Sequence, residues 1–359
     1  MRSLLITGGA GFIGANFVHY WLSTQPDDRL VVLDALTYAG NPANLATLDG
    51  RPDYAFVRGD ICDQALVTRL LEQYAIDTIV HFAAESHVDR SIVGPDDFIR
   101  TNVVGTHTLL QCARGAWQRD QVWQPGVRFH HVSTDEVYGS LRTEDPPCTE
   151  EAPYAPNSPY SASKASSDHL VRACHQTYGL PVTTSNCSNN YGPLQFPEKL
   201  IPLMLVRALA GEPLPVYGNG ENVRDWLHVS DHCRAIELVI NRGRVGQTYN
   251  VGGWNQWRNI DLVRHLCALL DERLGTDPAL RQRFPNCPGS SGRKVGTLIT
   301  FVADRLGHDW RYALDATKIE RELGFRPEET VETGMPKTLD WYLENEAWWR
   351  AILAGSYRL

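Results

Sequence analysis

The chain has 359 residues, of which 43% are hydrophobic and 21% are charged, and its formal net charge is −8. This length favours two domains or one enlarged domain, and the composition excludes a fibrous repeat or a disordered chain. The negative charge offers no basis for binding nucleic acid or an anionic membrane, so we expect neither partner. A substrate that carries phosphates would have to meet a local basic cluster.

The cysteines and the first residues bear on the cellular location. The apolar run at residues 3–7 breaks into glycines, so it is too short for a signal peptide or a membrane span. Eight cysteines occur at irregular intervals without a C-x-x-C pair. This spacing predicts no metal site and no disulfide framework. We therefore expect reduced thiols in a cytoplasmic protein.

Short apolar segments rich in β-branched residues alternate with longer amphipathic segments through the first half of the chain. This alternation predicts a Rossmann-type α/β fold with a doubly wound parallel sheet. The predicted strands are residues 3–7, 30–34, 77–83, 127–133 and 180–186, and the predicted helices are residues 12–22, 63–74, 95–117 and 159–178.

The composition of the sequence changes after residue 180, where proline and glycine become frequent. Long loops in a compact enzyme usually line a binding site. We therefore expect a cofactor-binding domain over residues 1–180 and a smaller mixed α/β substrate-binding domain over residues 181–359, with some strand or helix exchange back to the sheet. The segment 281–295 is interpreted as an exposed surface insertion.

A glycine-rich turn follows the first predicted strand. Gly8, Gly11 and Gly14 form G-x-x-G-x-x-G at the start of the first predicted helix, and Asp34 ends the next strand. Such a turn lets a pyrophosphate approach the backbone at a helix N-terminus, and an Asp in that place accepts hydrogen bonds from a ribose diol. The pattern predicts NAD rather than NADP. Asp60 and Ile61 fall where such a sheet meets the adenine.

Tyr160 and Lys164 lie four residues apart on the predicted helix 159–178, so both side chains share one face. A phenol is a poor base at neutral pH, but a neighbouring ammonium favours the phenolate and can hold the nicotinamide ribose. The pair suits removal of a hydroxyl proton while a hydride leaves the same carbon. For either residue taken alone, the alternative to a catalytic role is a position on the exposed face of the helix.

Three polar residues, Thr134, Asp135 and Glu136, follow the predicted strand 127–133. Ligands bind at the carboxyl ends of strands in parallel sheets, so Thr134 could hydrogen-bond a sugar hydroxyl. The adjacent carboxyl groups are either a solvated turn or an acid/base pair whose environments separate their pKa values. Their position beside a predicted hydride-transfer site favours the second interpretation.

Long motifs in order along the chain carry a resemblance to a known family. The segments TGGAGFIG, DALTYAGN, AAESHVDRSI, STDEVYG, PYSASKA, SNNYGPLQFPEKLIP, NVRDWLHV and ADRLGHDWRYALD resemble the dTDP-glucose 4,6-dehydratases, which are extended short-chain dehydrogenases. The resemblance runs from residue 3 to about residue 345. Leu306 departs from the pattern, because the family usually has proline there, but the flanking Arg305 and His308 are present.

The resemblance implies a role for each residue at the centre of the site. Tyr160, assisted by Lys164, would take the proton of the sugar 4-hydroxyl as NAD accepts a hydride from carbon 4. Glu136 would remove the proton of carbon 5, which the new ketone makes acidic. Asp135 would protonate the hydroxyl that leaves carbon 6, and the hydride would return to carbon 6. Such a carboxyl pair agrees with the need of an elimination for one base and one acid.

The resemblance also implies two sets of binding residues. The cofactor set is Gly8, Gly11, Phe12, Ile13, Gly14, Asp34, Leu36, Thr37, Asp60, Ile61, Ala83, Ala84, Ser86, Thr101, Tyr160, Lys164 and Asn190. The substrate set, for a small-molecule nucleotide sugar such as dTDP-glucose, is Ser86, His87, Thr134, Asn189, Lys199, Leu200, Pro215, Tyr217, Arg224, Asn259, Arg305 and His308. Arg224 and Arg305 suit a diphosphate, because a guanidinium fork matches phosphate oxygens.

Several alternatives stay open at this point. The same scaffold serves a UDP-sugar dehydratase, a 4-epimerase or a decarboxylase, and a non-catalytic NAD-binding regulator is a further possibility. Epimerases need no carboxyl pair, and a regulator would not need the Tyr-Lys pair, so the residues present disfavour both. By analogy we expect a homodimer formed through the helices that follow TNVVGT and contain Tyr160. Val103, Val104, Leu109 and Leu110 either supply that apolar surface or pack on the sheet.

Overall fold

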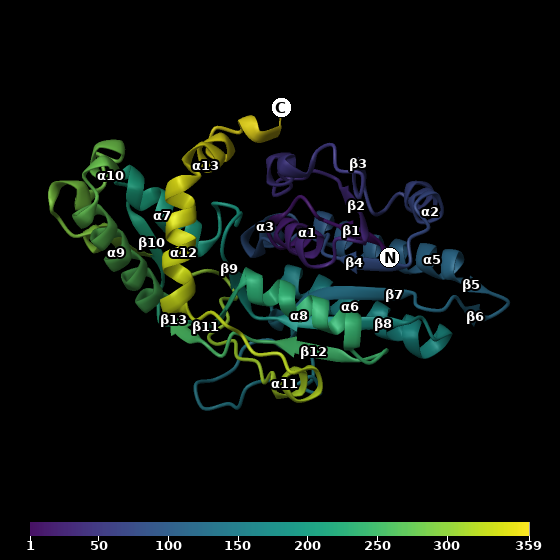
Figure 1. Cartoon of the computed structure of the whole chain (residues 1–359). Coiled ribbons are helices and arrows are strands. Elements are labelled where there is room, and N and C mark those ends of the chain that lie inside the picture. The colour runs from purple at the N-terminus through teal and green to yellow at the C-terminus, as the bar shows by residue number, and fades with distance from the viewer. Residues whose placement is uncertain (359) are drawn as a thin grey trace.

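Seven parallel strands form the central sheet of the protein (Figure 1). The structure is a computed structural model that describes residues 1–358. The strand order is β3-β2-β1-β4-β7-β8-β12, which is the doubly wound order with the first strand inside the sheet, so the predicted Rossmann fold is confirmed. The strands are β1 (Ser3–Thr7), β2 (Arg29–Asp34), β3 (Tyr54–Arg58), β4 (Thr78–His81), β7 (Arg128–Thr134), β8 (Val182–Cys187) and β12 (Thr248–Val251).

Helices cover both faces of this sheet, and this explains why its inner strands are apolar on both sides. Leu4 and Ile6 of β1 face one helical layer, and Leu5 faces the other. The first layer contains α1 (Phe12–Thr24) and α8 (Val229–Arg242), and α11 (Thr317–Leu323) packs beside β12. The second layer contains α2 (Gln64–Gln73), α5 (Thr106–Trp117) and α6 (Pro159–Tyr178).

A second core lies beside the carboxyl end of the sheet (Figure 1). It is built from helices α7 (Leu200–Ala210), α9 (Asn259–Thr276), α10 (Pro278–Arg283), α12 (Val331–Glu344) and α13 (Glu346–Leu353). Two small sheets join it: β10 (Leu214–Tyr217) pairs with β14 (Ile299–Val302), and β11 (Val223–His228) lies between β9 (Asn189–Tyr191) and β13 (Gln256–Arg258).

Strands β8 and β12, both beyond residue 180, complete the central sheet, and α8 packs against α1. The chain therefore crosses repeatedly between the two cores. The division near residue 180 remains a proposal, which must include this exchange.

The helix expected over residues 95–117 contains an irregular turn. Its first part, α4 (Asp96–Phe98), passes into a π-helical stretch, η3 (Ile99–Gly105), before α5 begins. Buried Asn102 explains the irregularity, because its side chain accepts from the backbone N–H of Glu85 at 2.9 Å and donates to the Glu85 carbonyl at 3.0 Å. The π turn therefore ties the helix to the loop after β4, and π turns frequently mark functional sites.

The interpretation of residues 281–295 as an exposed insertion was wrong. The side chains of Phe284, Cys287 and Val295 are at most 2% exposed and belong to the second core. Helix α10 and two 3-10 turns carry these side chains inward, while the polar residues between them stay at the surface. Short turns of this kind have no sustained hydrophobic periodicity, so these buried side chains could not be predicted from the sequence.

Short elements connect the rest of the fold. They are η1 (Pro42–Asn44), η2 (Ala46–Leu48), α3 (Val88–Val93), β5 (Gln118–Arg119), β6 (Val122–Trp123), η4 (Asp135–Tyr138), η5 (Pro288–Ser291), η6 (Val295–Leu298) and η7 (Ser356–Arg358). None of the helices formed by residues 1–358 is both long and apolar enough to cross a membrane. All eight cysteines are free thiols.

The packing of Phe284 generates a stability prediction. Replacing Phe284 by Ala should lower the free energy of unfolding by about 3–5 kcal/mol, because it empties a buried aromatic site. Val93→Ala is the control, since Val93 is 89% exposed and should change stability by less than about 0.5 kcal/mol. Urea unfolding followed by fluorescence measures both, and equal small effects would show that the 281–295 segment does not support the core.

Candidate active site

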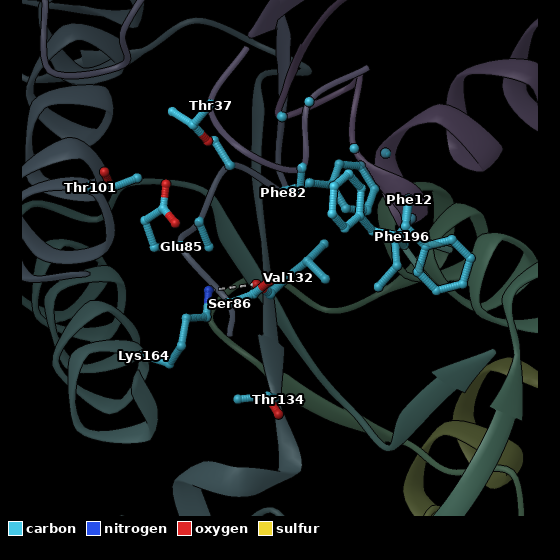
Figure 2. A pocket seen from close by; sticks show the side chains of 18 of the residues that line it. Phe12, Thr37, Phe82, Glu85, Ser86, Thr101, Val132, Thr134, Lys164 and Phe196 are labelled. Atoms are coloured by element: carbon cyan, nitrogen blue, oxygen red, sulfur yellow. Dashed lines mark hydrogen bonds between the residues drawn. The ribbon is translucent and has the colours of Figure 1, made fainter. Parts of the chain in front are cut away.

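A cavity of about 320 Å³ opens at the carboxyl ends of the central strands. This is the edge at which parallel sheets of this type bind ligands. The sequence-predicted residues that line it are Gly8, Gly11, Phe12, Ile13, Gly14, Asp34, Thr37, Asp60, Ile61, Ala83, Ala84, Ser86, Thr101, Thr134, Asp135, Glu136, Tyr160, Lys164, Asn189, Asn190 and Lys199. Figure 2 shows Thr134 and Lys164 toward one end of the pocket and Phe12 toward the other.

The glycine-rich turn has the close packing that its sequence predicts. Gly8 has a φ of +70°, and a Cβ there would lie 2.6 Å from the backbone nitrogen of Ala83. A Cβ on Gly14 would lie 2.3 Å from the Gly8 carbonyl oxygen. Gly11 differs, because it is the N-cap of α1, it lines the pocket, and a Cβ on it would meet the protein no closer than 3.3 Å. The free space at this helix N-terminus fits a pyrophosphate.

Asp34 is fixed at the end of β2 by backbone hydrogen bonds. Its Oδ2 accepts from the N–H of Ala10 at 2.9 Å, and its Oδ1 accepts from the N–H of Leu36 at 2.8 Å. Burial raises the pKa of Asp34, and these two N–H groups oppose that rise. The carboxyl group thus joins the glycine turn to the next loop and keeps lone pairs for a ribose diol. Leu36 has a φ of +54° and does not line the cavity.

Asp135 and Glu136 lie in the pocket wall at the start of η4, so the solvated-turn alternative is excluded. Asp135 is 3% exposed, and its Oδ2 has no hydrogen-bond partner among residues 1–358. Burial raises the pKa of Asp135 well above its usual value, and the charges of Glu136 and Asp225 raise it further. This shift favours the protonated form of Asp135, whose proton can be donated into the cavity.

Glu136 has a different environment from its neighbour. Burial raises the pKa of Glu136, but the positive charges of Lys199 and Arg224 oppose the rise. Burial raises the pKa of both groups and Arg224 opposes both rises, but carboxylates dominate the charges that act on Asp135, whereas Lys199 and two arginines dominate those that act on Glu136. This separation of environments is how one site obtains both an acid and a base.

Tyr160 and Lys164 lie on α6, where a capping box at Ser158 and Ser161 fixes the start of the helix. Burial raises the pKa of Tyr160 well above its usual value, and the charge of Glu136 adds to the rise, whereas a hydrogen bond with Thr134 lowers it. The Lys164 ammonium donates to the Val132 carbonyl at 2.9 Å. The expectation that Lys164 favours the phenolate is therefore outweighed by burial in the pocket, and Tyr160 is a neutral phenol here.

The other predicted substrate residues form a second group beside the cavity. Arg224 is 7% exposed, donates to the Asp309 carbonyl at 2.8 Å, and lies 4.3 Å from the centre of the Tyr312 ring. Arg305 donates to Asp89 at 3.0 Å. The charges of both guanidinium groups oppose the rise in the pKa of Glu136 that burial causes, so both arginines act electrostatically on that carboxyl group.

Six further predicted residues are placed outside the cavity lining. They are His87, which lies 3.8 Å from Glu198; Leu200, at the start of α7; Pro215 and Tyr217, in β10; Asn259, at the start of α9; and His308, whose Nδ1 lies 2.6 Å from an Asp304 oxygen. The Arg305 guanidinium lies 5.2 Å from the Tyr217 ring centre. Their proposed contacts with a nucleotide remain predictions.

Sequence reasoning missed four prominent lining residues. Figure 2 shows Phe82 and Phe196 gathered near Phe12 at one side of the pocket, and Glu85 on the opposite side. Glu198 also lines the pocket and lies 3.2 Å from Arg90. Phe82 and Glu85 follow β4, so their position at a strand end was an available signal. Phe196 and Glu198 come from an irregular loop whose path the sequence does not specify.

The chain is similar along its whole length to known proteins. Residues 5–338 match the family described as GDP-mannose 4,6 dehydratase. A dTDP-glucose 4,6-dehydratase of Xanthomonas campestris is 57% identical over 100% of this chain and 98% of that protein, and one of Neisseria meningitidis is 55% identical over the same shares. The crystal structure of the Streptomyces venezuelae dTDP-glucose 4,6-dehydratase, solved with NAD bound, is 50% identical, has a TM-score of 0.85, and covers 98% of this chain and 100% of its own.

A Rossmann pocket lined by a glycine-rich turn, a Tyr-Lys pair and two neighbouring carboxyl groups defines the class of the NAD-dependent nucleotide-sugar dehydratases. Within that class, the chain belongs to the dTDP-glucose 4,6-dehydratase family, whose members are hydro-lyases. The resemblance seen in the sequence motifs is confirmed.

The position of Gly11 gives a test of the dinucleotide site. Gly11→Ala should keep the fold with a small shift of the turn, because its Cβ would lie 3.3 Å from the Gly8 carbonyl oxygen, but it should bind NAD at least about ten-fold more weakly, because the added methyl lies in the lining of the pyrophosphate site. Gly115→Ala is the matched control, since a Cβ on Gly115 in α5 meets nothing within 4 Å. Circular dichroism checks the fold and calorimetric titration measures the affinity. Unchanged affinity in Gly11→Ala would place the pyrophosphate elsewhere.

Proposed function

We propose that this protein converts dTDP-glucose into dTDP-4-keto-6-deoxyglucose and water. The observation that carries the proposal is the pair of buried Asp135 and half-buried Glu136, which lines one pocket with Tyr160 and a dinucleotide-type glycine turn. A dehydration of this kind needs one proton acceptor and one proton donor beside a redox centre. Epimerisation at carbon 4 requires neither carboxyl group, so the pair favours dehydration over the 4-epimerase alternative.

NAD is the cofactor we propose for this site. Gly8 and Gly14 allow the tight turn, Gly11 lines the pocket where the pyrophosphate would lie, Asp34 offers lone pairs to the adenosine ribose, and Lys164 is placed to meet the second ribose. When bound, oxidised NAD supplies a positively charged nicotinamide that takes a hydride from carbon 4 of the sugar and later returns it to carbon 6. The overall reaction is redox-neutral, so the cofactor stays in place.

Tyr160 is the proposed acceptor of the proton of the 4-hydroxyl. Its buried phenol is neutral in the described pocket, so it needs added positive charge before it can act as a base. Thr134 holds the phenol oxygen by a hydrogen bond and lies where it can also contact the sugar hydroxyl. The Lys164 ammonium, on the next turn of the helix, also supplies positive charge that favours the phenolate of Tyr160.

Glu136 and Asp135 are proposed to complete the elimination. Glu136, kept more acidic than its neighbour by Lys199 and Arg224, accepts the proton of carbon 5, which the carbon 4 ketone makes acidic. Asp135, kept protonated by burial and by nearby carboxylates, donates its proton to the hydroxyl that leaves carbon 6. One proton is accepted and one is donated as water is released; the proton held by Glu136 then returns to carbon 5 as the hydride reaches carbon 6, and the proton taken up by Tyr160 balances the one that Asp135 has lost.

We also propose a cytoplasmic homodimer. The eight free thiols support a reducing compartment. Val104 and Ile99, near the start of the α5 segment, are 47% and 49% exposed and offer apolar surface for a partner copy. Leu109 and Leu110 are fully buried under the sheet, so they are not part of that surface.

The function is tested by incubating the purified protein with dTDP-glucose without added NAD. The proposal predicts turnover, detected by the alkaline absorbance of the 4-keto-6-deoxy product, because the cofactor should remain bound during purification. Glu136→Gln should lose about 10²–10⁴-fold in product formation while still reducing the bound NAD, since only the later proton acceptor is removed. NADH absorbance in a stopped-flow experiment follows the first step.

Glu144→Gln is the matched control, because Glu144 is exposed and remote from the pocket lining. It should behave as wild type. A strict need for stoichiometric external NAD would contradict the proposed function. Normal product formation by Glu136→Gln would leave the function standing but remove Glu136 as the carbon 5 base.

The environment of Asp135 gives a pH prediction. Asp135 must keep its proton, and the charge of Asp225 helps to raise the pKa of Asp135. Asp225→Asn removes that charge, so Asp135 should lose its proton at lower pH and the alkaline limb of the kcat profile should move to lower pH. The limb belongs to the coupled carboxyl pair rather than to one group. An alkaline limb that stays in place or moves upward would show that Asp135 is not the acid.

A further inference from the structure

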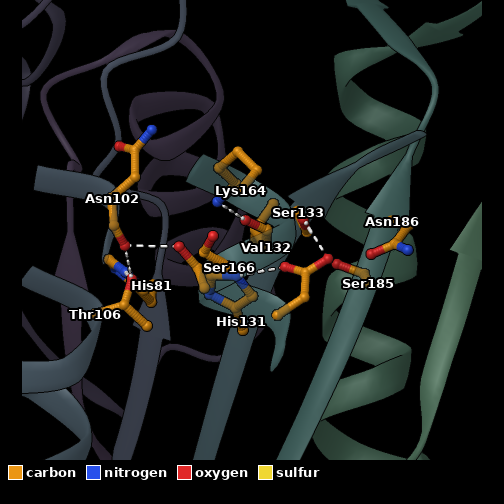
Figure 3. Close-up of polar contacts among 12 residues, drawn as sticks. His81, Asn102, Thr106, His131, Val132, Ser133, Lys164, Ser166, Ser185 and Asn186 are labelled. Carbon is orange, nitrogen blue, oxygen red and sulfur yellow. Dashed lines mark hydrogen bonds and ion pairs between the residues drawn. The ribbon is translucent and has the colours of Figure 1, made fainter. Parts of the chain in front are cut away.

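The ammonium of Lys164 is enclosed in the protein together with a carboxylate from its own helix. Lys164 is 4% exposed and Asp168 is 6% exposed. Asp168 lies four residues further along α6, so both side chains occupy the face of the helix that packs on the sheet. Figure 3 shows Lys164 reaching toward Val132 of β7, to whose carbonyl it donates. Asp168 takes no part in the proposed reaction steps.

Three donors converge on the Asp168 carboxyl group. His131 Nε2 lies 2.9 Å from Oδ1, and the Ser133 and Tyr154 hydroxyls donate to Oδ2 at 2.9 and 3.0 Å. His131 and Ser133 flank Val132 on β7, and their side chains point to the same face because the period of a strand is two. Helix α6 is therefore fastened to three successive residues of β7.

The electrostatic situation of Lys164 requires a negative charge nearby. A buried ammonium is costly unless it is paired, and its hydrogen-bond acceptor here is a neutral carbonyl. Burial lowers the pKa of Lys164, and the charge of Asp168 opposes this most strongly. Cys187 also lies nearby, but burial raises the pKa of its thiol, so it is neutral at pH 7. Asp168 is thus the anion that compensates Lys164.

The groups around Asp168 favour its ionised form, which the role of counter-ion requires. Burial raises the pKa of Asp168 to about 6, while the Lys164 charge and the Ser133 and Tyr154 hydrogen bonds oppose the rise. Burial lowers the pKa of His131 well below its usual value, and the adjacent His81, with its ring centre 5.3 Å away, is lowered in the same way. Both imidazoles are neutral, so Lys164 is the positive group beside this network: its ammonium is held on Val132, between the two β7 residues that hold Asp168, and its charge acts on Asp168 across that space.

His169, the next residue of α6, is a further group whose charge would favour ionised Asp168. On the other side of the network, the Tyr138 and Tyr154 hydroxyls both accept from the Asn186 side chain, at 3.0 and 3.1 Å. These phenols carry no charge at pH 7, because burial raises the pKa of each above its usual value. The surroundings therefore supply neutral hydrogen bonds rather than a competing anion.

We propose that Asp168 is a positioning residue that acts as the buried counter-ion of Lys164, holding the ammonium charged and fixed against β7. The carboxylate acts through Lys164 and touches neither substrate nor cofactor. That Lys164 then assists Tyr160 rests on the proposed function, but the coupling of the two charges can be measured without any substrate.

The chain permits a direct measurement, because it contains five lysines: Lys164, Lys199, Lys294, Lys318 and Lys337. Lysine labelled with ¹³C at Cε gives one NMR signal for each, and Lys164→Met identifies the signal of Lys164. In Asp168→Asn, which keeps the side-chain shape but removes the charge, the titration midpoint of Lys164 should fall by about one pH unit or more. The same midpoint in Asp168→Asn and wild type would overturn the proposal.

Asp231→Asn is the matched control. Asp231 on α8 is 1% exposed and accepts the backbone N–H groups of Glu328 and Glu329 at 3.0 and 2.9 Å, so its loss should disturb folding to a similar degree. It should leave the Lys164 signal unmoved. An equal shift in Asp231→Asn would show a general loss of structure instead of a specific ion pair, and would also overturn the proposal.

Two further variants keep the test decisive if Asp168→Asn folds poorly. Asp168→Glu restores the charge and should return the Lys164 midpoint toward that of wild type. Tyr154→Phe removes one hydrogen bond to the ionised carboxyl group, so it should lower the Lys164 midpoint in the same direction by a smaller amount. No shift in Tyr154→Phe together with no restoration by Asp168→Glu would contradict the counter-ion role.

A kinetic measurement connects the ion pair to catalysis. In Asp168→Asn the alkaline limb for reduction of bound NAD by dTDP-glucose should move to lower pH with the Lys164 midpoint, while KM changes less than about two-fold. A merely structural role would lower the melting temperature and leave that limb in place. If the wild-type protein is inactive toward dTDP-glucose while the Lys164 signal still shifts in Asp168→Asn, the proposed function is rejected but the coupling of Lys164 to Asp168 stands.

Discussion

The chemistry proposed for this protein depends on the placement of two neighbouring carboxyl groups, one buried and one half-buried, in a pocket wall at the end of one strand. Asp135 and Glu136 are adjacent in the chain and Arg224 acts on both, yet the balance of charges differs: Glu136 and Asp225 add to the rise in the pKa of Asp135, whereas Lys199 gives the largest opposition to the rise at Glu136. Burial makes this difference large, because charges interact more strongly where water is excluded. The same pair in a solvated turn would consist of two ordinary carboxylates and could not divide the roles of acid and base.

The fold supplies this environment by bringing strand ends together. Strand β1 leads into the glycine turn, β2 ends at Asp34, and β7 ends at Thr134 and the carboxyl pair. The second core adds Lys199 and Arg224 from the opposite side. Neither part makes a complete site alone, which explains why the chain crosses so often between the two cores.

Buried polar contacts fix the helices against this edge of the sheet. Asn102 in the π turn accepts from and donates to the Glu85 backbone, and it also donates to Ser163 on α6 at 2.8 Å. Asp168 fastens the same helix to β7. These contacts set the position of Tyr160 and Lys164 more rigidly than apolar packing alone, because each hydrogen bond specifies a direction as well as a distance.

The features that the sequence predicted well are local ones. The strand–turn–helix at Gly8 to Gly14, Asp34 at a strand end, and the Tyr160–Lys164 spacing all depend on residues close together in the chain. Their arrangement follows from the periodicity of helices and strands and from the rule that parallel strands bind ligands at their carboxyl ends.

The features that could not be predicted from the sequence depend on contacts between residues far apart in the chain. Phe196 and Glu198 reach the pocket through a loop without regular structure, and Phe284 enters the second core from a short turn that looked solvated. The expected influence of Lys164 on Tyr160 was also incomplete, because burial depends on the whole fold and outweighs one neighbouring charge.

The central claim is that one carboxyl group of the pair is protonated and the other ionised at neutral pH. Difference infrared spectroscopy of wild type against Asp135→Asn and Glu136→Gln, without substrate, measures this directly. The account predicts that Asp135→Asn removes a protonated-carboxyl band and that Glu136→Gln removes a carboxylate band. Loss of a carboxylate band in both variants, or the reverse assignment, would contradict it.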